Sequence, residues 1–149
     1  MRLKALRFIS LLFVILAAAP TFAHLLELPN KIGLSREDYL TVQQIYRGWA
    51  LAGIFIFGAL LSTLILTIMV RRRRAAFIPA LIALLCIVGT QALFWMFTYP
   101  ANRQTNNWTA LPENWAALRR QWEYSHAASA GLNFIALIAL IASILAQDE

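Results

Sequence analysis

Charged residues are scarce in this chain. Only 13% of its 149 residues are charged, and 60% are hydrophobic. Soluble domains carry about 25% charged residues, and a soluble domain of this length could not bury so much apolar surface. The scarcity of charge therefore excludes an ordinary soluble protein and indicates a lipid environment.

Cysteine and the common catalytic motifs are almost absent. Cys86 is the one cysteine, so the chain can form no internal disulfide, and a lone thiol makes no zinc or iron–sulfur site. We interpret Cys86 as a small apolar core residue. A Gly-rich phosphate loop, a nucleophile elbow and a CxxC pair are all missing. These absences exclude several large classes of enzyme.

Uncharged stretches, in contrast, are long. Four of them separate the clusters of charge, and each is close to or above the roughly 20 residues that a helix needs to cross ~30 Å of hydrocarbon. Strand-like alternation is absent, and lipid cannot satisfy open backbone groups. The sequence therefore predicts an all-α membrane protein, a single four-helix domain over residues 1–149 with spans at about 6–26, 48–70, 76–99 and 126–146.

Basic residues gather on one predicted side of the membrane. Arg2, Lys4 and Arg7 precede the first span, and Arg71–Arg74 fill the turn between the second and third spans. The positive-inside rule places such clusters in the cytoplasm. We therefore expect a multi-pass protein of the cell (plasma or inner) membrane with both termini cytoplasmic. The net charge of +6 then indicates contact with anionic lipid, not with nucleic acid.

The N-terminal segment permits a second interpretation. Residues 1–23 have a basic start, an apolar middle and small residues at Thr21 and Ala23, which is typical of a secretory signal. Cleavage after Ala23 would leave three spans and make His24 the first residue, able to chelate copper through its amine and ring. The uncut chain is the favoured alternative, because residues 24–27 continue the helix and four spans make an even bundle.

The outer loops carry helix signals of their own. Ser35 and Asp38 form a capping box, and Leu34 with Tyr39 forms a hydrophobic staple. We expect the helix that follows to run directly into the second span. In the other outer loop Pro112 suits a first helical position. Apolar residues there alternate at spacings of three and four, which predicts an amphipathic outer loop helix; they are Trp108, Leu111, Trp115, Leu118 and Trp122.

Two His/Glu pairs stand at matching depths. His24 and Glu27 lie near the outer end of the first span, and Glu123 and His126 begin the last. Residues three apart share a helix face, and because the two spans run in opposite directions, each His lies about one turn deeper than its Glu. Packed helix axes are 8–10 Å apart, so we predict that His24 and His126 lie within ~8 Å of each other. These four residues are the candidate catalytic group.

The same four residues are also the candidate metal ligands. Inward-facing Glu-x-x-His pairs bind metals inside helical bundles, but the second and third spans offer no further carboxylate at this level. A single metal ion held by His24, Glu27, Glu123 and His126 and a site that needs no cofactor are both open. A third alternative is a polar collar that only closes the bundle.

Polar residues continue from this group into the bundle. Ser129 and Asn133 follow His126 on one face, and Gln91 lies within the third span. Polar residues inside a membrane protein often mark a functional site, but Asn and Gln also form hydrogen bonds between helices. The second interpretation is favoured for Gln91 and Asn133.

Four segments, "AHLLELPNK", "IYRGWALAG", "FWMFTYPANRQTNNW" and "LPENWAALRRQWEYSHAAS", resemble the anthrone-oxygenase-like family of small four-helix membrane proteins. The resemblance covers nearly the whole chain. It implies a four-helix membrane fold and, for the members that give the family its name, oxidation of an anthrone to an anthraquinone with oxygen and no well-defined cofactor. Its most specific part is the series Asn102, Trp108, Trp115, Arg119, Trp122 and His126.

Two classes of function follow. The first is a membrane oxygenase or oxidoreductase that acts on a small apolar, anthrone-like substrate on the outer side. His126 or His24 would be the base, oriented by Glu123 or Glu27, and Asn102 or Arg119 would stabilise the enolate oxygen. Trp95, Tyr99 and Trp122 would wall this site. The predicted substrate-binding residues are thus Asn102, Trp95, Tyr99, Arg119 and Trp122.

The second class is non-enzymatic: a membrane module that binds a metal or a small ligand, or an assembly partner of a membrane complex. The metal content of the purified protein and its oxygen uptake with an anthrone distinguish these hypotheses. The sequence leaves the substrate, the cofactor and the oligomeric state open.

Overall fold

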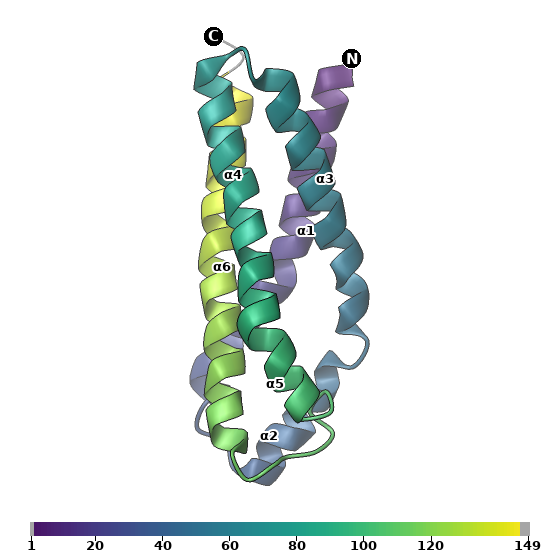
Figure 1. Ribbon diagram of the computed structural model, residues 1–149, viewed down its shortest axis with the longest axis vertical. Helices are drawn as coiled ribbons and strands as arrows, with labels where there is room; N and C mark the ends of the chain where they lie inside the picture. The colour runs from purple at the N-terminus through teal and green to yellow at the C-terminus, as the bar shows by residue number, and fades with distance from the viewer. Residues whose placement is uncertain (1, 147–149) are drawn as a thin grey trace.

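The computed structural model of the chain describes residues 2–146, so Met1 and residues 147–149 lie outside it. Four long helices run alternately in opposite directions, as Figure 1 shows. α1 and α4 each pack against both α3 and α6, which gives a four-cornered bundle. The helices are α1 (Arg2–Lys31), α3 (Gly53–Val70), α4 (Arg74–Leu93) and α6 (Trp115–Leu145).

Four helical segments are long and apolar enough to cross a membrane: Leu3–Lys31, Trp49–Val70, Arg74–Gln104 and Trp115–Leu145. The chain is thus an integral membrane protein with four spans, and the predicted all-α bundle is confirmed. Three of the spans are longer than expected. α1 passes through Pro20 and Pro29 without ending, and the third span continues through a π-helical segment, Phe94–Thr98, into α5 (Tyr99–Gln104).

Small residues are frequent at the contacts between the helices. Large apolar side chains, among them Leu51, Phe57 and Leu85, are exposed on the outer faces of the bundle. Small residues allow helix backbones to approach closely in lipid, where apolar burial gives no driving force between helices. The fully buried alanines of this core are Ala59, Ala76, Ala80, Ala83 and Ala136.

The two ends of the bundle differ. The start of α1, the end of α6 and the turn from Arg71 to Arg73 lie at one end, which we call the terminal end (Figure 1). α2 (Arg36–Gln43), α5 and residues 105–114 lie at the opposite end, the loop end. The prediction that both basic clusters share one side is therefore confirmed.

The segment after α1 forms a strap across the loop end. The Ser35 hydroxyl caps α2 by accepting a hydrogen bond from the Asp38 backbone N–H at 3.1 Å, as the capping box predicts. α2 does not run into the second span, because Gly48 adopts a left-handed φ of 90° that ends the helical path. Two 3₁₀ turns, Gln44–Tyr46 and Trp49–Ala52, fill the interval instead. We call residues 36–52 the strap.

The second outer loop differs from the expectation. No helix begins at Pro112; Asn114 precedes the first turn of α6, which runs from Trp115 into the membrane without interruption. Asn106, Asn107 and Trp108 all have left-handed φ angles of 49–61°, so Trp108 lies in a tight turn. α2 is therefore the outer loop helix of this fold. The apolar stripe still buries its side chains, in a cluster of Tyr39, Ala101, Trp108, Leu118 and Trp122.

Candidate functional site

His24 of α1 and His126 of α6 contact each other at the loop end. Their ring centroids are 4.2 Å apart, which confirms the predicted approach. Trp122 contacts both rings, at 4.8 and 4.3 Å. Tyr46 and Trp49 of the strap contact His24 at 4.5 and 5.5 Å. The histidine pair is thus enclosed by aromatic rings, with His24 buried and His126 half-buried.

Lys31 supplies a buried positive charge beside this enclosure. Its ammonium lies 3.1 Å from Glu123 Oε1 and 3.7 Å from Glu27 Oε2, and it donates a hydrogen bond to the Tyr46 hydroxyl at 2.7 Å. It also lies over the rings of Tyr46 and Trp122, at 4.4 and 4.9 Å from their centroids. One cation therefore connects α1, α6 and the strap.

Two strap tyrosines hold the glutamates. The Tyr39 hydroxyl donates to Glu123 Oε1 at 2.9 Å, and the Tyr46 hydroxyl donates to Glu27 Oε2. Burial first, and the adjacent carboxylate second, raise the pKa of both phenols well above the ordinary value. Both phenols therefore keep their protons and remain donors. Gln43 in turn donates to the Tyr39 oxygen.

Three buried polar atoms in this group have no hydrogen-bond partner. They are His24 Nδ1, Glu123 Oε2 and Gln43 Oε1. The nearest carboxylate oxygen to His24 Nδ1, from Glu27, is 3.8 Å away, beyond hydrogen-bond length. Buried polar groups are paired in the great majority of cases, so these atoms are available to a ligand or to water. Lys31 and Tyr39 both contact Glu123 Oε1, so the expected orientation of His126 by Glu123 stays a prediction.

Asn102 holds the tryptophan that covers the histidine pair. Its Oδ1 accepts hydrogen bonds from Trp108 Nε1 at 3.1 Å and from Trp122 Nε1 at 2.9 Å. This shared acceptor fixes the indole of Trp122 in contact with both histidines. Asn102, predicted to touch the substrate, therefore acts on the site through Trp122, and direct binding of substrate stays a prediction.

Arg119 likewise belongs to the surrounding scaffold. Its Nη1 donates to the Leu34 carbonyl at 2.7 Å, and its guanidinium lies over the Trp115 and Tyr39 rings at 4.6 and 5.4 Å. The side chain thus joins α6 to the strap. Its predicted contact with an enolate oxygen is untested.

Trp95 and Tyr99 lie apart from the enclosure. Their side chains are 61% and 39% exposed, and their rings contact each other at 5.1 Å on the face of the third span. The π-helical segment before Pro100 rotates this face, because proline has no N–H to continue the regular α-helical ladder. These two rings lie outside the histidine enclosure, so their predicted role as walls of a substrate site is untested. Any contact with substrate at the lipid face stays a prediction.

The polar residues that follow His126 on its face of α6 lie where α6 contacts a neighbouring helix. Asn133 Nδ2 donates to Thr21 Oγ1 at 3.0 Å and so joins α6 to α1, while Ser129 is buried on the same face. Gln91 donates only locally, to its neighbour Thr90 at 3.3 Å. The interhelical interpretation is thus confirmed for Asn133, whereas the hydrogen bond of Gln91 stays within its own helix.

A metal centre is not supported. Within residues 2–146 no group of three or more His, Cys, Asp and Glu side chains is arranged to hold a metal ion. The physical reason is Lys31, whose ammonium occupies the position between the two carboxylates that a cation would take. Metal binding by the predicted set of His24, Glu27, Glu123 and His126 therefore stays a prediction.

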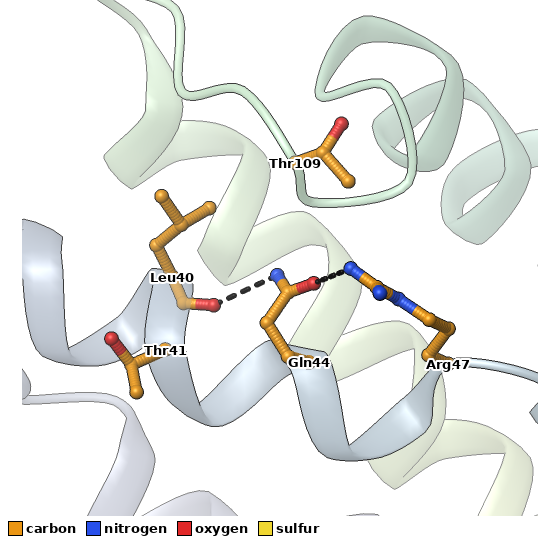
Figure 2. A pocket seen from close by; sticks show the side chains of 5 residues that line it. All are labelled: Leu40, Thr41, Gln44, Arg47 and Thr109. Carbon is orange, nitrogen blue, oxygen red and sulfur yellow. Dashed lines mark hydrogen bonds between the residues drawn. The ribbon is translucent and has the colours of Figure 1, made fainter.

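An open hollow of about 340 Å³ lies over the strap, outside the enclosure. Gln44 donates to the Leu40 carbonyl at 3.0 Å and accepts from Arg47 at 2.8 Å, as Figure 2 shows. These polar groups satisfy one another, and neither histidine is among the lining residues. The hollow is lined by Leu40, Thr41, Gln44, Arg47 and Thr109.

The sequence did not single out four members of this site: Lys31, Tyr39, Tyr46 and Trp49. One signal for Lys31 was present, because it follows Glu27 by four residues and such a pair shares a helix face.

Comparison of the chain with protein-family models, curated proteins and solved structures finds no match. The structure itself shows a four-span membrane protein with a histidine pair, enclosed by aromatic rings, at its loop end.

Proposed function

We propose that this protein is a membrane enzyme whose histidine pair removes a proton from a small apolar aromatic carbon acid, so that dioxygen can oxidise that carbon. The observation that carries the proposal is the contact of His24 with His126 inside an aromatic enclosure. The unpartnered atoms His24 Nδ1 and Glu123 Oε2 support it, because they leave hydrogen-bonding capacity at the site. The resemblance to the anthrone-oxygenase-like family supports an anthrone-like substrate.

The two histidines take different roles. His126 is the base, because it is only half-buried whereas His24 is enclosed behind it. His24 packs against His126 and fixes the plane of its ring. Trp122 and Tyr46 present apolar faces to an aromatic substrate. Lys31, which lies against these same two rings, supplies positive charge beside the enolate that forms.

The proposed reaction balances without a further reductant. A proton moves from the substrate CH₂ group to His126, and the electron pair left behind spreads into the ring system as an enolate. One dioxygen molecule adds at this carbon, and the adduct takes up the proton to form a hydroperoxide. Loss of water then leaves a ketone. One oxygen atom enters the product and the other leaves as water, so that the four-electron oxidation of carbon matches the reduction of dioxygen.

Oxygen uptake with anthrone as the probe tests this proposal. The full chain in lipid vesicles should consume oxygen and form anthraquinone well above the rate in empty vesicles. General-base catalysis contributes about 10²–10⁴-fold, so His126→Ala should lower the rate toward that of empty vesicles. Tyr124→Phe is the matched control, because Tyr124 lies on the same helix but is 57% exposed. Equal rates with and without the wild-type protein would refute the proposal.

We also propose that the terminal end faces the cytoplasm. Lys4, Arg7 and Arg71–Arg74 lie at this end, and the positive-inside rule favours that side for basic clusters beside spans. The histidine pair would then lie near the outer surface of the cell membrane.

A further inference from the structure

Basic side chains gather at the terminal end of the bundle. Lys4, Arg7 and Arg71–Arg74 stand at the terminal end. In the part of the chain that the structure describes, the acidic side chains all lie toward the loop end; they are Glu27, Glu37, Asp38, Glu113 and Glu123. The described surface of the terminal end is therefore positive throughout, with both basic clusters contributing.

A hollow of about 260 Å³ opens between α1 and α6 at this end. Its lining residues are Lys4, Arg7, Phe8, Leu11 and Ile144. On α1, Arg7 and Phe8 follow Lys4 by three and four residues and precede Leu11 by four and three, so the four share one face. The two cations stand toward the end of the helix, and at 1.5 Å per residue Leu11 lies about 10 Å deeper than Lys4 and about 6 Å deeper than Arg7.

This order of side chains matches the order of groups along a phospholipid. Charged residues occupy the level of the headgroups, and apolar residues follow where the acyl chains begin. Phe8 is 67% exposed and forms an apolar wall that faces outward from the bundle. A hollow of this volume is smaller than a cleft for a whole drug-sized ligand, so it suits a headgroup and the first part of one acyl chain.

We propose that the hollow is a binding site for an anionic phospholipid, with the phosphate between Lys4 and Arg7 and an acyl chain along Phe8, Leu11 and Ile144. Basic pockets between membrane helices are suited to anionic headgroups. The apolar lower wall favours a lipid over free phosphate, which would leave that wall uncovered. The site is at the opposite end of the bundle from the histidine pair. Lipid binding here can therefore be confirmed or refuted independently of the proposed enzyme activity.

Retention of lipid by the full chain tests the proposal. The protein is reconstituted in vesicles of phosphatidylcholine with one quarter phosphatidylglycerol. It is then extracted, and native mass spectrometry identifies the lipids that remain bound to it. We expect wild-type protein to retain phosphatidylglycerol preferentially. The double variant Lys4→Gln/Arg7→Gln should lose this preference by roughly 30-fold, about fivefold for each cation near an anionic surface.

Two further variants separate the hollow from general surface charge and from misfolding. Arg72→Gln/Arg73→Gln removes the same charge from the turn at the same end and should keep the preference. Lys4→Arg/Arg7→Lys keeps the charge of the hollow and should also keep it. Equal retention of both lipids by wild-type protein would overturn the proposal. So would equal loss in the turn variant, loss in the charge-preserving variant, or displacement of the lipid by inorganic phosphate.

Discussion

The ammonium of Lys31 lies 3.1 Å from a carboxylate oxygen of Glu123 and thereby joins α1 to α6 at the loop end of the bundle. The side chains are 5% and 0% exposed, so the pair is removed from solvent. Tyr39 and Tyr46 of the strap attach to the same group. The ion pair is therefore the point at which the two helices and the strap above the histidines are held together.

Loss of one member of this pair should destabilise the fold. Removing one partner of a buried ion pair costs about 3–5 kcal/mol, because the other charge stays buried. Lys31→Met should reach the upper part of this range, since it leaves two carboxylates without their cation. Glu123→Gln should cost less, because Glu27 still faces Lys31 at 3.7 Å. Unfolding in detergent measures both changes.

The double variant Lys31→Met/Glu123→Gln tests whether the two residues act through each other. Its loss of stability should be smaller than the sum of the single losses, as coupled neighbours require. The exposed Glu113→Gln is the control and should change stability by less than about 0.5 kcal/mol. Additive single and double losses would show that the pair does not hold the loop end.

Asn102→Ala should loosen the aromatic enclosure. Two indole N–H groups lose their shared acceptor, and an unsatisfied buried donor costs about 1–3 kcal/mol. We expect a loss of about 2 kcal/mol or more, together with a red shift of tryptophan fluorescence as Trp122 and Trp108 become wetter. Gln104→Ala, at the exposed end of the same helix, is the control. An unchanged spectrum would argue against this role for Asn102.

Gly48→Ala should strain the strap through the backbone alone. Gly48 has a φ of 90°, and a Cβ there would meet nothing within 4 Å. A residue with a side chain costs about 1–2 kcal/mol in this region. Gly33→Ala is a matched control, because Gly33 has equally open space and no left-handed φ, so it should be neutral or slightly stabilising. Equal effects at both glycines would contradict the strained turn.

Much of the fold could be read from gaps between charges, because lipid tolerates few charged groups and the helices need about 20 apolar residues each. The histidine contact followed from two pairs at spacing three on antiparallel spans. Lys31 could not be placed in the same way. Its local sequence indicates a basic residue at a helix end, and only the packing of α1 against α6 brings it to Glu123.

Two other features have local causes that the spacing of residues does not reveal. The strap does not continue as a helix because of one glycine conformation at Gly48. Trp95 lies within the π-helical segment of the third span and Tyr99 follows it, and both side chains are exposed. Both features change the direction of side chains without changing the apolar pattern.

Reporter fusions test the proposed orientation. A reporter that is active only in the cytoplasm should be active when fused after Glu149, and one that is active only after export should be active at Asn106. The physical reason is the basic charge at the terminal end. The opposite pattern would reverse the orientation and place the histidine pair near the cytoplasmic surface.

The mass of the intact protein tests the alternative of cleavage after Ala23. We expect the mass of the chain that starts at Met1. A mass equal to that of the chain from His24 would indicate cleavage.

The central claim is that His24 and His126 work as one unit, and anthrone-dependent oxygen uptake by the two single variants and the double variant tests it most directly. Each of His24→Ala and His126→Ala should lower the rate strongly while the helical circular dichroism stays that of wild type. Residues that act together are not additive, so His24→Ala/His126→Ala should be no slower than the slower single variant. A double variant whose loss equals the product of two separate losses, or single variants as active as wild type, would contradict the account.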